Sequence, residues 1–371
     1  MKKLLLSVGL ALALSGLAQA KTPPEVLKSY KSYRAALKAG DATAALTHGY
    51  EAWQTAENIL GDDKVTGDLA QNYAMIKNDA GSKTVRKRQE AAYERALELT
   101  AGYGVDAPTM YLERGVNLMN FYVINNQKSS AYTASRKFVK YAEENNLTTT
   151  TFYGELLTHQ AGHYASKAQH KKAERVAEKA LASFAGTTDN LLTPIPILAN
   201  LYKGYGLEGQ SKSMEAALSY QKVMESLDGI QPNEHPLAAK ALGRWSHMRA
   251  VLNREGKLEE AENKGLCKCW PYDKPRNESL KPIKRVPPKM PRKAYVSGFS
   301  IVQFDVDDGG TPTNAEILVS WPEGLYEKSS LKSMEGWEYT PRTSEETDGD
   351  RQGLITTIRY MLTDRSGDII Y

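Results

Sequence analysis

Between residues 24 and 264 the sequence repeats a helical pattern at a nearly constant spacing. Alanine, leucine and tyrosine recur three and four residues apart, and Gly, Asn, Asp or Pro interrupts the runs. Six helix pairs are predicted, whose first helices begin near Pro24, Thr66, Pro108, Thr149, Thr193 and His235. These starts lie about 42 residues apart, which predicts a solenoid of helical hairpins. Because each hairpin buries its apolar face only against its neighbours, we expect one cooperative array.

The fourth pair shows the pattern most clearly, with helices predicted over residues 153–168 and 170–184. One apolar stripe of the second helix contains Ala173, Val176, Ala177, Ala180, Leu181 and Phe184. In the sixth pair, residues 256–262 are similar to the start of the second helix in tetratricopeptide-like repeats. Arrays of this kind present a concave groove, so we expect a second protein to bind there.

The last part of the chain changes from helical to strand periodicity. Residues 298–306 alternate apolar and polar side chains, and residues 315–320 form a second strand pattern. Glycines at 309 and 310 between them favour a tight hairpin turn. The pattern of residues 325–335 predicts a short amphipathic helix, and that of residues 353–362 predicts a last strand. This region therefore predicts a small α+β domain.

These residues, in this order, resemble the C-terminal domain of the TonB energy-transducer family. The positions that match are Gly298, Phe299, Val302, Phe304, Val306, Gly309, Tyr326, Leu331, Trp337, Tyr339 and Pro341. The chain departs from the family pattern at Met290, where a tyrosine is usual before the proline. The resemblance covers about a fifth of the chain. The fold class expected is mostly α: an α-solenoid of about six helical hairpins followed by a small α+β TonB-like C-terminal domain.

The resemblance implies that the C-terminal domain binds an extended peptide segment of an outer-membrane TonB-dependent transporter. Strand addition is the physical route, because an edge strand offers unpaired N–H and C=O groups to a second chain. We expect this edge to be the last strand, with Thr357, Arg359 and Met361 on its outer face. The predicted partner-binding residues are Leu354, Thr356, Thr357, Ile358, Arg359, Tyr360 and Met361.

The N-terminal residues 1–20 have the three parts of a secretory signal: Lys2 and Lys3, an apolar run, and small residues near Ala20. The run is shorter than the roughly 20 residues that span a bilayer. We therefore expect a cleaved leader and a periplasmic protein; the alternative is an inner-membrane protein anchored by the uncleaved segment. A cleaved leader conflicts with the resemblance, since a standard transducer keeps a membrane helix through which an inner-membrane motor acts.

Four segments are expected: the signal peptide 1–20, a helical repeat domain 21–265, a Pro/Lys-rich linker 266–292 and the TonB-like domain 293–371. The linker contains a basic cluster, which is either a solvated connection or a contact with anionic lipid head groups or cell wall. The formal net charge of the whole chain is only +4, which argues against nucleic acid as a partner.

Cys267 and Cys269 are the two cysteines of the chain, and they lie where the repeats give way to the linker. An oxidising compartment favours a disulfide between them. The alternatives are an intermolecular bridge, or a reduced pair that binds a soft metal. The sequence does not decide among the three.

No catalytic motif and no cofactor-binding motif is found. His159 and His163 are spaced as a zinc pair on one helix face, but Gln160 replaces the glutamate of a zinc protease and a third ligand is not evident. We therefore expect no metal, no cofactor and no enzyme. Two functions remain: a TonB-family protein that supports energy-coupled uptake, or an envelope scaffold that uses both regions to bind protein or cell wall.

Overall fold

The computed structural model describes residues 22–185, 194–227, 235–272, 280–344, 346–365 and 367–369. The expected signal peptide lies outside these residues. The chain divides into two compact units, the first ending at Ala134 and the second running from Ser135 to Tyr371. Helices dominate, and a small antiparallel sheet region occupies the C-terminal part, which confirms the mostly-α class.

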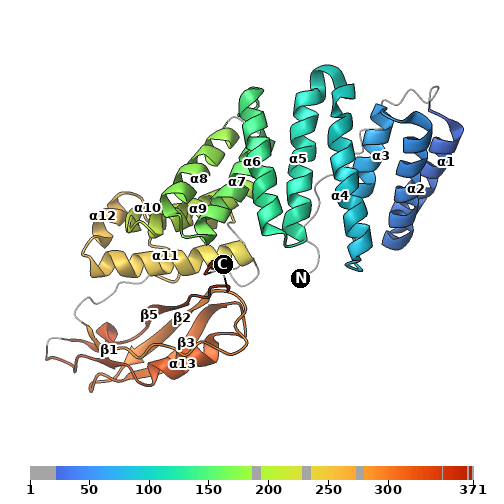
Figure 1. Ribbon diagram of the computed structural model, residues 1–371. Coiled ribbons are helices and arrows are strands. Elements are labelled where there is room, and N and C mark those ends of the chain that lie inside the picture. Colours follow the sequence, from blue (N-terminus) through green and yellow to red (C-terminus); the bar gives the residue numbers. More distant parts are fainter. Residues whose placement is uncertain are drawn as a thin grey trace. The chain divides into compact units, whose positions relative to one another are not determined.

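The helices of the first unit are α1 (Pro24–Ala39), α2 (Ala42–Leu60), α3 (Lys64–Ala74), α4 (Lys83–Glu98), η1 (Leu99–Asp106) and α5 (Ala107–Ile124), with α6 (Lys128–Glu144) crossing the boundary between the units. Side-chain caps begin three of them: Asp41 accepts from Ala44 N–H in α2, and Asp63 and Ser82 cap α3 and α4. Consecutive helices from α1 to α5 pack side by side (Figure 1).

The second unit contains α7 (Thr151–Ser166), α8 (His170–Phe184), α9 (Ile195–Glu208), α10 (Ser213–Glu225), α11 (Pro236–Arg254) and α12 (Leu258–Asn263). The six predicted starts fall within two residues of the starts of α1, α3, α5, α7, α9 and α11. The sequence pattern did not predict the 3-10 helix η1, in which Gly104 has a φ of 56°. Glycine adopts a positive φ without steric cost, so Gly104 allows the chain to turn between η1 and α5.

Small residues set the close spacing of the helices in the second unit. Ala161, Ala165, Ala173 and Ala177 are fully buried. At Gly206 in α9, an added Cβ would lie 2.6 Å from the backbone nitrogen of a residue in α8. Backbones that approach this closely exclude larger side chains, which explains why alanine and glycine recur along the predicted apolar stripes.

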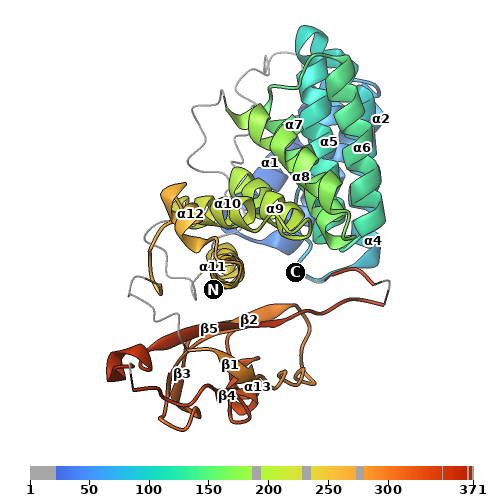
Figure 2. The same cartoon turned by 90° about the vertical axis from the view of Figure 1, so that its left-hand side faces the viewer.

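The strands are β1 (Pro282–Lys284), β2 (Gly298–Val306), β3 (Pro312–Trp321), β4 (Glu338–Tyr339) and β5 (Leu354–Tyr360), with helix α13 (Glu327–Met334) and the short η2 (Asp348–Asp350) between them. Three strands form an antiparallel sheet in the order β3-β2-β5, and β1 pairs with β4. Figure 2 shows α13 on one face of the three-stranded sheet and α11 on the other. Sheet and helices α7–α12 thus belong to one unit, and the expected boundary near residue 265 falls inside it.

The segment expected as a linker is partly packed. Leu266 is buried in the helical core, and residues 282–284 form β1. The backbone oxygen of Val286 accepts a hydrogen bond from the indole N–H of Trp337 at 3.0 Å. The guanidinium of Arg285 lies 4.8 Å from the same indole ring. Residues 273–279 lie outside the described residues.

Trp337 anchors the core between the sheet and α13. Its side chain is 4% exposed and packs edge-on against Phe304 at a centroid distance of 6.4 Å. Tyr326 stacks on Tyr360 in the same core, and the hydroxyls of Tyr360 and Ser330 are 2.9 Å apart. These contacts join β2, β5, α13 and the residues before β4 into one apolar cluster.

Replacing Trp337 with alanine should lower the free energy of unfolding of the second unit by about 3–5 kcal/mol, because a buried aromatic ring is lost. Denaturant unfolding of the full chain measures the change. Trp270, which is 48% exposed, provides the matched control, and its replacement by alanine should have little effect. Equal stabilities of the two variants would contradict this account of the core.

Candidate functional site

Strand β5, the expected partner-binding element, lies at one edge of the three-stranded sheet. It pairs with β2 on one side, and within the described part of the chain no strand pairs with its other side. Two sets of side chains alternate along it. The structure places Leu354, Thr356, Ile358 and Tyr360 on the face toward α13, and Thr357, Arg359 and Met361 on the face toward α11.

The backbone of β5 can be assigned residue by residue. The N–H of Val306 in β2 donates to the oxygen of Arg351, while the N–H of the following residue donates toward β3. Because backbone groups alternate between the two neighbours, the even-numbered residues of β2 are directed at β5. Val302 is in register with Thr356, so the N–H and C=O of Thr356 are directed at β2. Those of Thr357 are therefore directed at the open side of the sheet.

The sequence predicted that the outer face of β5 is available to a partner, but other residues of the same unit contact this face. Arg359 Nη1 lies 2.8 Å from Glu208 Oε1 in α9. The hydroxyls of Thr357 and Tyr272 are 3.4 Å apart. Met361 Sδ lies 3.6 Å from a guanidinium nitrogen of Arg244 in α11. The edge of the strand, rather than its outer face, is what remains as the candidate site.

Gly243 explains how α11 comes so close to the sheet. The ring of Phe299 in β2 lies against this glycine, in space that a Cβ at Gly243 would occupy. Phe299 and Ile301 of β2, together with Val319 of β3, are buried within the hydrophobic core of helices α9 to α11. Burial of these apolar side chains is the main force that holds sheet and helices together.

An ion cluster lies beside this contact. Glu208 Oε1 accepts from Arg244 and from Arg359, each at 2.8 Å, and Glu208 Oε2 accepts from the hydroxyl of Tyr220 at 2.7 Å. Burial opposes the charged form of Glu208, but the two arginines and the tyrosine outweigh it and lower its pKa to about 2. Burial, and then the charge of Arg359, lower the pKa of His247 to about 4, so this imidazole is neutral at pH 7.

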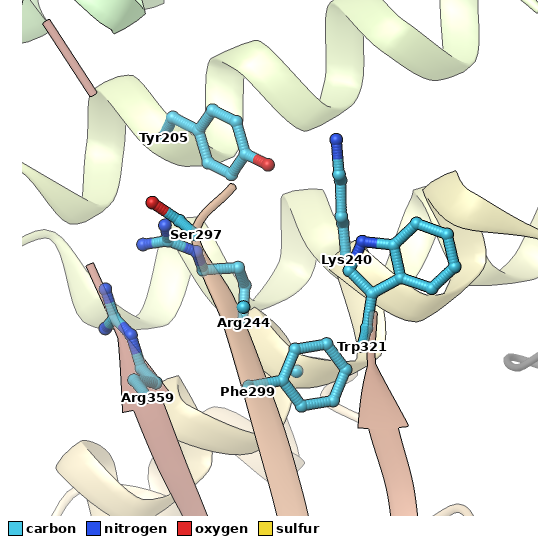
Figure 3. Close-up of a pocket in the computed structure, with 9 residues that line it drawn as sticks. Tyr205, Lys240, Arg244, Ser297, Phe299, Trp321 and Arg359 are labelled. Atoms are coloured by element: carbon cyan, nitrogen blue, oxygen red, sulfur yellow. The ribbon is translucent and has the colours of Figure 1, made fainter. Parts of the chain in front are cut away.

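A small cavity opens between α9, α11 and the sheet (Figure 3). Its lining includes Tyr205, Lys240, Arg244, Phe299, Trp321 and Arg359. Figure 3 shows Tyr205 and Lys240 reaching it from helices, and Phe299, Trp321 and Arg359 from strands. Burial, and then the neighbouring Arg244, lower the pKa of Lys240.

Neither this cavity nor the ion cluster was predicted from the sequence. Glu208 is the last residue of α9, and Arg244 lies within α11, the first helix of the next pair. Arg359 lies in the last strand. No motif joins them, since they meet only through the docking of the sheet on α11. Because Glu208 ends its helix whereas Arg244 lies near the middle of α11, an alignment of the repeats does not pair them either.

The other candidate residues from the sequence are the histidine pair in α7 and the two cysteines. His159 and His163 lie in α7, and burial, then His163, lower the pKa of His159 to about 4. Among the described residues, no group of three or more His, Cys, Asp or Glu side chains is arranged to hold a metal ion. Cys267 and Cys269 form a disulfide within the chain. The Cys267 backbone also bonds Gln221 and Arg249.

Comparisons with known proteins add little. No family model matches the sequence, and no curated protein matches it. Among solved structures, BtubC (BKLC) from P. vanneervenii is similar with a TM-score of 0.41 and 13% sequence identity, over 69% of this chain and 95% of that chain. A likeness at this level carries no argument about function. In the described part of the chain, no helix has both the length and the apolar character needed to cross a membrane.

Replacing Gly243 with alanine should destabilise the second unit by about 1–3 kcal/mol, because the new methyl group collides with the Phe299 ring. The same change inside a helix normally stabilises by up to about 1 kcal/mol, so the sign of the effect is diagnostic. Denaturant unfolding measures it, and Gly102→Ala, where the nearest atom is 3.6 Å away, is the control.

A double-mutant cycle with Phe299→Ala completes this test, since the penalty at Gly243 should disappear once the ring is removed. A stabilising effect of Gly243→Ala in the otherwise unchanged chain would show that the sheet does not dock on α11 through this contact.

Proposed function

We propose that this chain is a periplasmic TonB-family protein that binds an extended segment of an outer-membrane transporter and supports energy-coupled uptake. The observation that carries the proposal is the edge position of β5, with the backbone groups of Thr357 directed at its open side. An incoming strand would pair with these groups and extend the sheet. Main-chain pairing supplies affinity with little demand on the sequence of the partner.

The helical repeats have a separate role in this proposal. The six helix pairs form a tetratricopeptide-like solenoid whose groove binds a second protein. That second protein would connect the chain to the inner-membrane motor that the resemblance implies. The proposed periplasmic location and the proposed connection to the motor are both based on the sequence of residues 1–20 and on the resemblance.

A second candidate function is an envelope scaffold, in which the sheet domain only holds protein or cell wall. The docking of the sheet on α11 favours this alternative, since Phe299 and Arg359 fix the domain to the repeats. A transducer that reaches across the periplasm is expected to carry its C-terminal domain on a longer free arm. The two functions differ in the partner that β5 contacts.

The test is photo-crosslinking in intact cells of the source organism, with the reactive residue at Met361, which follows β5 and is 43% exposed. We expect capture of an outer-membrane transporter through its periplasmic segment, identified by mass spectrometry. Thr357→Pro should lower the yield by about fivefold, because the outward N–H is lost and one hydrogen bond contributes about 1 kcal/mol.

Thr357→Val is the matched control, since it removes the hydroxyl that contacts Tyr272 but keeps the backbone N–H. Both variants should retain the cooperative unfolding of the second unit. The backbone groups of β5 that bond to β2 are those of Thr356 and of every second residue from it, and neither variant changes them. Capture of only periplasmic, inner-membrane or wall-associated partners would support the scaffold instead. Undiminished capture by Thr357→Pro would contradict strand addition at this edge.

A further inference from the structure

Residues 281–296, which precede β2, run along helix α13 in the direction opposite to it. Close to the end of α13, the backbone oxygen of Val286 accepts a hydrogen bond from the indole of Trp337 at 3.0 Å. Close to the start of α13, the hydroxyl of Ser329 donates to the backbone oxygen of Lys289. Segment and helix therefore lie side by side on the face of the sheet that is turned away from α11 (Figure 2).

The exposed side of this segment and of α13 is rich in positive charge. The segment contains six cations and no acid, and α13 adds two lysines. All eight side chains are exposed, and we call them the basic face: Lys281, Lys284, Arg285, Lys289, Arg292, Lys293, Lys328 and Lys332. The acids within α13 and next to it are Glu323, Glu327, Glu335 and Glu338. Positive charge therefore exceeds negative charge by four.

Most of the basic face has no counter-ion. Lys284 Nζ lies 2.7 Å from a carboxylate oxygen of Glu338, and the guanidinium of Arg285 lies over the ring of Trp337. The charged groups of the other six residues form no ion pair and no hydrogen bond with any described residue. Like charges held this close repel one another, and an anionic partner would remove that repulsion.

Exposed apolar side chains are interleaved with these cations. Ile283 is 63% exposed and Tyr295 is 68% exposed, and Val286 and Met290 are exposed between them. Four of the eleven large apolar side chains that are exposed in the described part of the chain thus lie within these sixteen residues. A concentration of exposed apolar surface marks an interaction site. The partner therefore offers apolar contact beside its negative charge.

A bilayer that contains anionic phospholipid has both properties, because its acyl carbon lies directly below a layer of phosphate groups. Tyrosine rings favour this boundary. Lysine and arginine place their apolar stems in it while their charges stay with the phosphates. A hydrophilic acidic polymer would satisfy the charge alone and would leave Ile283 and Tyr295 in water.

We propose that the basic face binds the surface of a bilayer containing anionic phospholipid. Lys289, Arg292 and Lys293 contact the phosphates, and Ile283 and Tyr295 enter the boundary between head groups and acyl chains. This inference goes beyond the proposed function and does not depend on it, because none of these residues belongs to β5.

The experiment measures how much of the purified chain floats with lipid vesicles in a density gradient. Residues 1–20 are omitted, because their apolar run would itself bind a bilayer, and every described residue is kept. Vesicles of phosphatidylcholine alone are compared with vesicles of equal parts phosphatidylcholine and phosphatidylglycerol. We expect saturable binding to the mixed vesicles only, weakened by added sodium chloride because salt screens the attraction. Equal binding to both kinds of vesicle, or to neither, would overturn the proposal.

Charge removal tests where the vesicles bind. Arg292→Gln combined with Lys293→Gln should weaken binding about 25-fold, because each cation near an anionic surface contributes a factor of about five. Lys38→Gln combined with Lys222→Gln is the matched control, since it changes the net charge equally at exposed lysines of α1 and α10. An equal loss of binding in the control pair would show a general charge effect and would overturn this site.

Apolar contact is tested separately, to distinguish a bilayer from an acidic polymer. Ile283→Ser should weaken vesicle binding about fivefold, because part of an apolar side chain is no longer buried. Val105→Ser, at a side chain in η1 that is 96% exposed, is the matched control and should leave binding unchanged. Tyr295→Ser repeats the test if thermal unfolding shows that Ile283→Ser does not fold. Unchanged vesicle binding by the folded variant, or tighter binding to soluble polyglutamate than to vesicles, would overturn the lipid proposal.

Discussion

The ring of Phe299 rests on Gly243, at a point in α11 where any side chain would collide with it. This contact lets the sheet approach the helix closely enough for Arg359 to reach Glu208. The same approach places Lys240 and Trp321 on two sides of a small cavity. The ion cluster and the pocket therefore both depend on the absence of one Cβ atom in α11.

Docking also decides which part of β5 a partner can use. Thr357, Arg359 and Met361 are turned toward the helices, and the side chains alternating with them fill the core over α13. With both faces covered, the strand offers its backbone edge. A partner that pairs with this edge would be selected mainly by its ability to form an extended strand. Side chains at the ends of β5 would add further selectivity for the partner.

The sequence predicted the elements well and their assembly poorly. Local periodicity placed the helix starts near Pro24 and His235, because each hairpin is specified by its own apolar stripe and its own breakers. The strand edge at Thr357 followed from alternation and the resemblance. The sequence could not predict that Phe299 packs against Gly243, since Gly243 looks like any glycine within a helical pattern. It could not predict the Glu208–Arg359 ion pair either, because only the docking of the sheet on the helices brings these two residues together.

Hydrogen exchange of single backbone amides tests directly whether the edge of β5 is open to a partner strand. The measurement compares the free chain with the chain bound to the periplasmic segment of a captured transporter. The amides of Thr357 and Arg359 should become protected on binding, while those of Thr356 and Ile358, already bonded to β2, should exchange slowly in both states. Binding that leaves the exchange of Thr357 and Arg359 unchanged would contradict strand addition at this edge.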